Sequence, residues 1–281
     1  MDISLAEERA YYFVPQIPLD EARSRIEKKK TTLVAGMFGT LISRPNPTEI
    51  EVVSVESRLE PYWVAAVATR TGYDRQQTYT VPLKGDEIRE VTILGQKLSV
   101  SSKSSPSLTL NGIEHCVEEH KVTRYFDGLS GQKTDLSRYQ NYTKTEITDL
   151  EDFAPEGMLV VPPQMKATVV VRQVLGEAIH PVSKAQIIHE ERVDVQSIDL
   201  NFRPVYAVEY EWTSKGKRVV IEFDALLGDI KTGGKKWSDQ IKGILTRDLF
   251  FDVTADAVGM LVPGGGIAVK LVKAVVDRGK K

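Results

Sequence analysis

Alternation of hydrophobic and polar residues recurs in two regions of the chain and predicts strands in both. The first alternating run begins at Glu49, and Gly72-Tyr73-Asp74 is typical of a hairpin tip inside that region. The strands expected in the first region cover residues 49–57, 62–69, 77–83 and 91–100. Those expected in the second region cover residues 193–201, 205–212 and 218–224.

Helical spacing of apolar residues occurs upstream of each strand region. It predicts a helix over residues 20–30, with Asp20 as its cap. Residues 164–179 predict a second helix, and residues 183–191 predict a short third one. Helices that cover one face of an antiparallel sheet give an α+β layer arrangement, which is the fold class we expect.

Two stretches of the sequence echo each other. VVSVESRLEPYWVA begins at Val52, VQSIDLNFRPVYAV begins at Val195, and one offset aligns Pro61 with Pro204. A second echo joins YFDGLSGQK to EFDALLGDI. We interpret the echoes as an internal repeat of two related units, each a helix with antiparallel strands. Because proline cannot donate a ladder hydrogen bond, each proline is expected at a strand start or a bulge.

The second unit resembles a PepSY domain. Its helix, RPVYAV strand, hairpin and FDALLGDI ending match over about Ser183 to Ile230, with a weaker copy before Val100. The resemblance implies a small α+β fold of the PepSY and cystatin-like kind, used in binding, including peptidase inhibition, and usually found outside the cytoplasm. The expected fold is therefore two related helix-plus-antiparallel-sheet units with a C-terminal helical hairpin.

Composition divides the chain into four segments. SSKSSPSLTLNG, which covers residues 101–112, is typical of a linker. We expect a first α+β unit over residues 1–100 and a linker with connecting strands and loops over residues 101–162. A second, PepSY-like unit is expected over residues 163–233, and the helical hairpin over residues 234–281.

Four residues are predicted to form turns, in two equivalent places. They are Asp127 with Gly131, and Asp224 with Gly228. A short acidic side chain at such a position accepts hydrogen bonds from backbone amides, and glycine supplies a positive φ. The alternative is a cation site, because Glu222 and Asp224 share one side of a strand, but spacing places no further carboxylate cluster nearby.

The composition permits a packed core and limits the partners. Hydrophobic residues make up 41% and charged residues 27% of the 281 residues. The net charge of −2 and the aromatic content of 7% both disfavour nucleic acid as the partner. Cys116 is the single cysteine, which excludes an intramolecular disulfide. Because the acidic N-terminus lacks the apolar stretch of a secretory signal, we expect a cytoplasmic protein.

Plausible metal ligands are concentrated in His115-Cys116-Val117-Glu118-Glu119-His120, a strand or short helix. In a helix, His115 and Glu119 would share a face; in a strand, His115 would share one with Val117. Neither conformation assembles three ligands, and the known zinc, phosphate-loop and nucleophile-elbow motifs are missing. We therefore expect no cofactor and no catalysis. The alternative is a metal-dependent enzyme that uses His115, Glu119 and His120.

The C-terminal segment has apolar residues at helical spacing from Trp237, a Pro-Gly break at residues 263–266 and a second helical pattern over residues 267–276. This pattern predicts a helical hairpin. Its apolar length is too short to span a membrane. The residues expected to contact a partner or a membrane surface are Trp237, Ile241, Leu249, Phe250, Phe251, Met260, Leu261, Lys270 and Lys273.

These patterns favour a non-enzymatic cytoplasmic binding or scaffold protein. Its interface would consist of sheet edges and the helical hairpin, and its partner would be another protein or a second copy of the chain. The first alternative is a peripheral membrane protein whose hairpin enters one leaflet of an anionic membrane. The second alternative is the metal-dependent enzyme described above.

Overall fold

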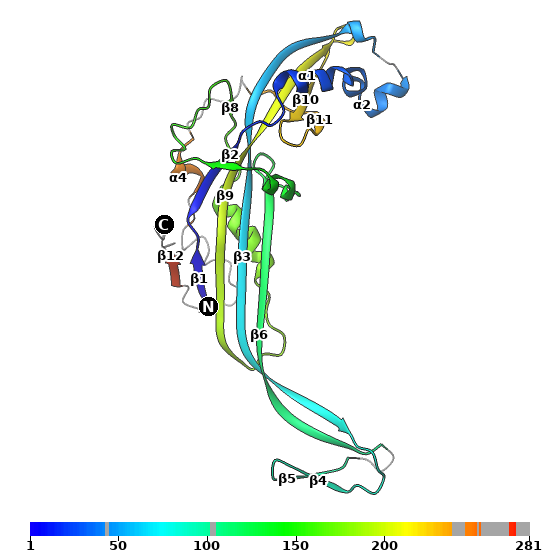
Figure 1. Cartoon of the computed structure of the whole chain (residues 1–281), viewed down its shortest axis with the longest axis vertical. Coiled ribbons are helices and arrows are strands. Elements are labelled where there is room, and N and C mark those ends of the chain that lie inside the picture. Colours follow the sequence, from blue (N-terminus) through cyan, green and yellow to red (C-terminus); the bar gives the residue numbers. More distant parts are fainter. Residues whose placement is uncertain (43–44, 102–104, 238–244, 252, 254–269, 274–281) are drawn as a thin grey trace.

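Three very long strands form the body of an elongated, curved molecule (Figure 1). A computed structural model describes residues 1–42, 45–101, 105–237, 245–251, 253 and 270–273. The long strands are β3 (Ile50–Pro82), β6 (Ser107–Asp127) and β9 (Ile187–Trp212). β3 lies in the middle and is antiparallel to both of the others.

β3 is continuous over 33 residues, so the breaks predicted within it are wrong. Gly72-Tyr73-Asp74 is not a hairpin tip, because each of these residues pairs with β6 on one side and with β9 on the other. Strand pairing on both sides overrides the local turn signal. The register of β3 on β9 shifts between Gly72 and Tyr73, where β9 has one extra residue, His189.

Shorter strands complete a sheet of ten strands among the described residues. β1 (Asp2–Leu5) and β2 (Glu8–Phe13) are parallel to β9, and β12 (Lys270–Lys273) is parallel to β1. β10 (Lys217–Asp224) also pairs with β9, and β11 (Ile230–Thr232) pairs with β10. β7 (Lys144–Glu146) pairs with β2, and β8 (Leu159–Val160) pairs with β3.

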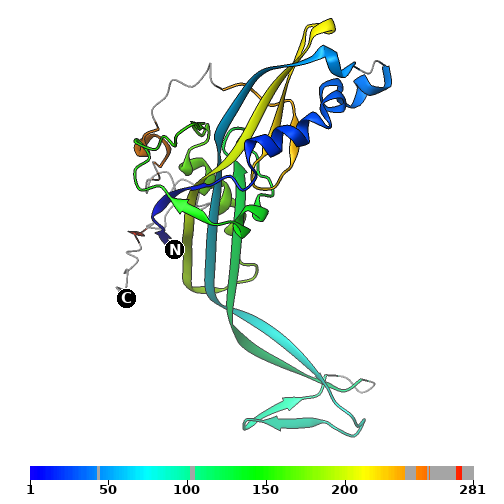
Figure 2. The same cartoon turned by 45° about the horizontal axis from the view of Figure 1, so that its top comes forward.

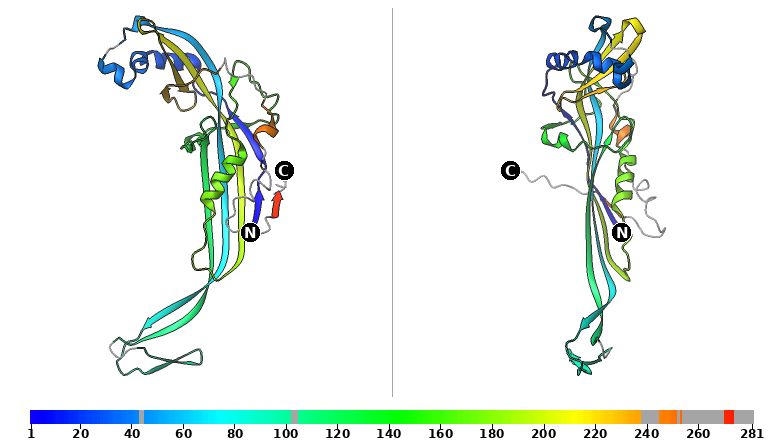
Figure 3. Two further views of the ribbon diagram at one scale, coloured as in Figure 1. Left: turned by 180° about the vertical axis from the view of Figure 1, so that it is seen from behind. Right: turned by 90° about the vertical axis from the view of Figure 1, so that its right-hand side faces the viewer.

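Helices cover the sheet only in part. α1 (Leu19–Glu27) packs against β10, and α2 (Lys30–Ile42) follows it with a kink at Gly36. α3 (Ala167–Ala178) packs against β3, β6 and β9. Figure 3 shows α1 at the end of the molecule and α3 nearer its middle. The remaining helical pieces are short: η1 (Pro47–Glu49), η2 (Ser137–Asn141), η3 (Thr213–Lys215) and α4 (Arg247–Phe250).

The core consists mainly of two apolar clusters. The larger lies under α3, whose buried Val170 and Val174 are about one helical turn apart. It includes Trp63, Phe126 and Phe202, all with no exposed surface. The smaller lies under α1 and includes Tyr206 and Phe223. Each helix therefore buries its apolar face on the long strands, which is what its sequence pattern requires.

β3 and β6 continue beyond β9 as a two-stranded arm (Figure 2). The last pairing with β9 joins Asp74 to Ile187, and the following residues of β3 pair with β6 alone. At the tip, β4 (Glu90–Ile93) and β5 (Gln96–Ser99) form a separate hairpin. The linker predicted over residues 101–112 is wrong in its second half, because β6 begins at Ser107.

The predicted α+β class with two PepSY-like, cystatin-like units is wrong. The described residues are mostly sheet, and the two echoing stretches are adjacent antiparallel strands of one sheet, with Leu59 opposite Pro204. They are therefore not an internal repeat of separate helix-plus-sheet units. Residues 187–191 of the expected third helix belong to β9. In the expected C-terminal hairpin, Lys270–Lys273 is strand β12, because it pairs with β1.

The different surroundings of Gly128 and Gly176 predict opposite effects of alanine substitution on stability. The Gly128 N–H donates to the Pro61 carbonyl at 3.0 Å, and a Cβ on Gly128 would lie 2.6 Å from that oxygen. We expect Gly128→Ala to lower the free energy of unfolding by about 1–3 kcal/mol. In α3, a Cβ on Gly176 would meet no atom within 4 Å beyond its own helix backbone. Gly176→Ala is therefore expected to raise the free energy of unfolding by about 0.5–1 kcal/mol. Urea unfolding of both variants tests this, and changes of the same sign would contradict it.

Candidate functional site

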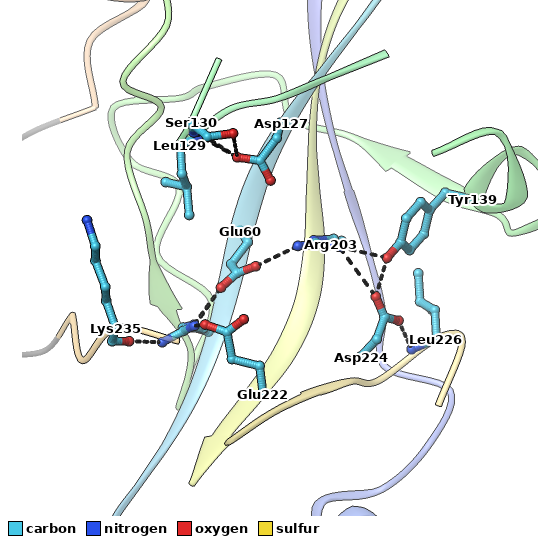
Figure 4. Close-up of polar contacts among 11 residues, drawn as sticks. Glu60, Asp127, Leu129, Ser130, Tyr139, Arg203, Glu222, Asp224, Leu226 and Lys235 are labelled. Atoms are coloured by element: carbon cyan, nitrogen blue, oxygen red, sulfur yellow. Dashed lines mark hydrogen bonds and ion pairs between the residues drawn. The ribbon is translucent and has the colours of Figure 1, made fainter. Parts of the chain in front are cut away.

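One face of the central strands carries a buried row of charged side chains (Figure 4). Arg58 and Glu60 are two residues apart on β3, so both face this side, and Arg203 of β9 lies opposite Glu60. Glu222 and Asp224 of β10 extend the row. Arg58, Glu60, Arg203 and Asp224 are all less than a tenth exposed. Buried charges of this kind are stable only when they are paired and hydrogen-bonded.

Arg58 forms a contact with each of its three guanidinium nitrogens. Nε donates to Glu60 Oε1 at 2.9 Å, and one terminal nitrogen donates to the Lys235 carbonyl at 2.7 Å. The other terminal nitrogen forms an ion pair with Glu222. The planar guanidinium suits this site because its donors point in fixed directions. Arg58 thereby ties β3 to β10 and to the segment that follows β11.

Arg203 connects the row to β9. It donates to Glu60 Oε2 at 2.9 Å and to the Tyr139 hydroxyl at 3.0 Å, and Tyr139 donates to Asp224. Burial lowers the pKa of the Arg203 guanidinium, but Glu60 and Tyr139 outweigh it and the net shift is upward. Burial also raises the pKa of the Tyr139 phenol. Both groups therefore keep their protons at neutral pH, and Glu60 bridges two cations.

Glu222 is the least compensated carboxylate of the row. Burial and the nearby Glu60 carboxylate raise its pKa, while Arg58 lowers it by a smaller amount. A folded-state pKa above the unfolded value means that ionisation of Glu222 opposes folding. Below the pKa of the unfolded state, Glu222 is neutral in both states and its contribution to stability is complete. That contribution is lost as the pH rises through the pKa of the folded state.

Glu222→Gln is expected to stabilise the protein relative to the wild type at pH 7 to 8 and to have little effect near pH 4. The amide keeps an acceptor for Arg58 but carries no charge to bury. Urea unfolding of both proteins across this pH range measures the difference. A stability difference that does not change with pH would show that the pKa of Glu222 is the same in the folded and the unfolded state.

A cavity of about 110 Å³ lies beside the charged row. Its lining includes Glu60, Asp135, Arg138, Tyr139, Arg203, Glu222, Asp224, Asp229 and Lys231. Both oxygens of Glu60 and of Asp224 already accept hydrogen bonds or ion pairs from the chain itself. The buried carboxylates thus hold β3, β9 and β10 in register, and they leave little acceptor capacity for a ligand.

The four predicted turn residues lie in two turns of the same geometry. Asp127 and Asp224 each accept hydrogen bonds from the N–H groups of the second and third residues that follow, at 2.8–3.1 Å. The glycines four residues on, Gly131 and Gly228, have φ angles of 72° and 74°. Each glycine N–H also donates to the carbonyl of its aspartate at 2.8 Å. The shared FD-x-x-x-G pattern is therefore the sequence of a turn.

The candidate metal ligands do not come together. His115 and Glu119 lie on one side of strand β6, about 13 Å apart along it, and His120 faces the other side. His115 Nδ1 lies 2.7 Å from Asp74 Oδ1, and Glu119 forms an ion pair with Arg70. The part of the chain that the structure describes contains no group of three or more His, Cys, Asp or Glu side chains placed to hold a metal ion.

The residues expected to contact a partner or a membrane have different environments. Trp237, Phe250 and Phe251 are buried, and Phe251 packs edge-on against Trp63 with ring centroids 5.3 Å apart. These three side chains therefore belong to the core. As for the others, Leu249 is 47% exposed, Lys270 and Lys273 lie on β12, and Ile241, Met260 and Leu261 lie outside the described residues.

β6 forms an edge of the sheet, and its backbone groups alternate in direction. Its pairing with β3 has no register shift from Ser107 to Asp127, and no other described strand pairs with it. The carbonyls of Ser107 and Tyr125 accept hydrogen bonds from outside the sheet, from the N–H groups of Ser101 and Thr134, at 3.0 Å. Because alternate residues of a ladder point the same way, the odd-numbered residues of β6 direct their N–H and C=O groups outward.

Among the described residues, nothing pairs with the middle of this edge, which we call the open edge. From Thr109 to Lys121, no described residue forms a hydrogen bond with the outward-directed backbone groups. The odd-numbered side chains are exposed, and Ile113 and Val117 are more than half exposed. Figure 1 shows no strand beside this margin of β6. The edge also lacks a proline and a bulge, which are common ways to block unwanted strand pairing.

The charged row and the open edge were both missed by sequence reasoning. The signal for the row was the pair Glu60-Pro61 and Arg203-Pro204, which the echo aligns, since two opposite charges occupy equivalent positions in otherwise apolar runs. No signal in the sequence could identify the edge, because the order of strands in a sheet is a long-range property.

Comparison with known proteins identifies no neighbour: no family model, no curated protein and no solved structure matches the chain. The resemblance to PepSY domains therefore has no support from a relative. Among the described residues, no helix has the length and apolar character needed to cross a membrane.

Proposed function

We propose that this chain is a non-enzymatic binding or scaffold protein that takes a partner strand along the open edge of β6. The row of outward-directed backbone groups from Thr109 to Lys121 carries this proposal. A strand added to such an edge gains main-chain hydrogen bonds, and the side chains on both faces select the partner. Sheet edges are also the interface that the alternating sequence pattern favours.

The body of the molecule holds this edge in place from His115 onward, where β3 also pairs with β9. β6 pairs with β3 along the whole length of β6, and Arg124 of β6 donates a hydrogen bond to Glu177 of α3 at 2.6 Å. Val122 packs against the cluster under α3. An edge that is already ordered loses little conformational entropy when a partner strand binds. The buried positions of Trp237, Phe250 and Phe251 give the C-terminal segment no comparable support as an interface.

Val117→Pro tests the proposed function. The Val117 N–H points outward, so proline removes one outward donor and no bond to β3, and edge strands tolerate proline at such positions. We expect the variant to stay folded and to bind its partners at least tenfold more weakly, as measured by light scattering for self-association and by quantitative pull-down for other proteins.

Glu118→Pro is the matched control, because its N–H points toward β3. This substitution is expected to lower the melting temperature, whereas Val117→Pro is expected to change it little. A folded Val117→Pro variant that keeps all the associations of the wild type would contradict the proposed function.

A further inference from the structure

We propose that the partner strand is β6 of a second copy of this chain, paired antiparallel about a two-fold axis at Val117. This inference rests on the proposed function and adds the partner and the register. The observation that carries it is the sequence IEHCVEEHK, residues 113–121, which is complementary to itself when it is reversed about Val117.

Basic and acidic side chains face each other in this register. His115 lies opposite Glu119 of the second copy, and Glu114 lies opposite its His120. The two-fold axis repeats each pair, and Ile113 lies opposite Lys121. No two like charges are directly opposite. Cross-strand pairs of opposite charge stabilise a sheet and like charges destabilise it, so this register is favoured.

Neighbouring registers are less favourable. A shift of the axis by one residue toward the C-terminus places Glu118 opposite itself, and a shift by one residue the other way places Glu114 opposite Glu118. A half-residue shift sets outward-directed residues against inward-directed ones, which removes the ladder hydrogen bonds. The charges of this segment therefore select the axis at Val117.

The backbone groups suit the same register. Val117 is odd-numbered, so its N–H and C=O point outward and form two hydrogen bonds with Val117 of the second copy. The pairs on either side, His115 with Glu119 and Ile113 with Lys121, do the same. The ladder ends near Thr123, whose carbonyl already accepts a hydrogen bond from Arg124.

The paired side chains are already positioned in the single chain. Asp74 holds His115 through a 2.7 Å contact, and Arg70 holds Glu119. Both remain accessible, with the His115 side chain 79% and the Glu119 side chain 60% exposed. Across the interface, Asp74, His115, Glu119 and Arg70 would form one row of alternating acidic and basic groups. Lys121 is exposed and has no partner among the described residues.

Two substitutions at Ile113 test the register with opposite expected signs. Ile113 is 60% exposed, so neither change disturbs the core. Ile113→Glu places a carboxylate opposite Lys121 of the second copy and is expected to tighten the dimer several-fold. Ile113→Lys places a lysine opposite Lys121 at both symmetry-related positions, and is expected to weaken the dimer about tenfold. Sedimentation equilibrium of the full chain measures both dissociation constants.

Cysteine cross-linking tests the axis directly. In a Cys116→Ser background, Val117→Cys places the two thiols on residues about 5.5 Å apart at Cα, which is within disulfide range. Thr123→Cys is the matched control, because its two copies would be about 40 Å apart. Mild oxidation is expected to give a covalent dimer of the first variant and none of the second.

A chain that stays monomeric and forms no Val117→Cys dimer would overturn the second copy as partner. Equal effects of the two Ile113 variants, or equal cross-linking at both cysteine positions, would overturn the register. If in either case Val117→Pro still abolishes binding to another protein, the proposed function stands without this inference.

Discussion

Arg203→Met is expected to lower the free energy of unfolding by about 3–5 kcal/mol, because it leaves buried charges without their partner. Arg203 is 9% exposed and contacts Glu60, Tyr139 and Asp224. Methionine fills much of the space but donates no hydrogen bond. One oxygen of Glu60 then loses its cation, and Asp224 loses a nearby positive charge. Urea unfolding at pH 7 measures the loss as a lower midpoint at an unchanged slope.

Arg138→Met is the matched control for this variant. Arg138 lines the same cavity and pairs with Asp229, but its side chain is 61% exposed. Exposed ion pairs contribute about 0–1 kcal/mol, so the control is expected to unfold almost as the wild type does. If both variants lost the same free energy of unfolding, the contribution of Arg203 to stability would not depend on its burial.

Trp63→Ala is expected to cost about 3–5 kcal/mol, the other large effect in the molecule. Trp63 has no exposed surface and lies in the cluster under α3, where its indole N–H donates to the Met165 carbonyl at 2.9 Å. Alanine leaves a cavity at the place where Phe251 packs against the indole ring. Unfolding followed by circular dichroism measures the loss.

Trp63→Phe separates packing from hydrogen bonding at this position. Phenylalanine keeps much of the apolar volume but leaves the Met165 carbonyl without its donor, which costs about 1–3 kcal/mol. The loss is therefore expected to be smaller than that of Trp63→Ala. If both variants unfold at the same urea concentration, the hydrogen bond rather than packing would account for the whole effect.

Local structure was largely predictable from the sequence, and strand continuity was not. The helices expected over residues 20–30 and 164–179 correspond to α1 and α3, since apolar spacing acts within a few residues. The predicted cap Asp20 is wrong, because it lies inside α1 and Pro18 is the N-cap. The segment around Gly72 carries a turn signal of the same local kind. β6 and β9 hold it extended from both sides, and the sequence pattern alone does not show those neighbours.

The candidate sites depended on the same long-range information. Arg58 and Glu60 meet Arg203 only because the register of β3 on β9 sets them together across more than a hundred residues of chain. The His115–His120 segment contains residue types that bind metal ions. Because the segment is an edge strand, its histidines and glutamates alternate between two faces, and their arrangement suits pairing between strands rather than coordination of one ion.

Residue-resolved amide exchange along β6 tests the central claim most directly, in the dilute chain and in the associated state. Even-numbered amides from Leu110 to His120 are expected to be protected in both states, because they bond to β3. Odd-numbered amides from Thr109 to Lys121 are expected to exchange fast in the dilute chain and to become protected on association. Odd-numbered amides that exchange equally fast in both states would contradict strand addition at this edge.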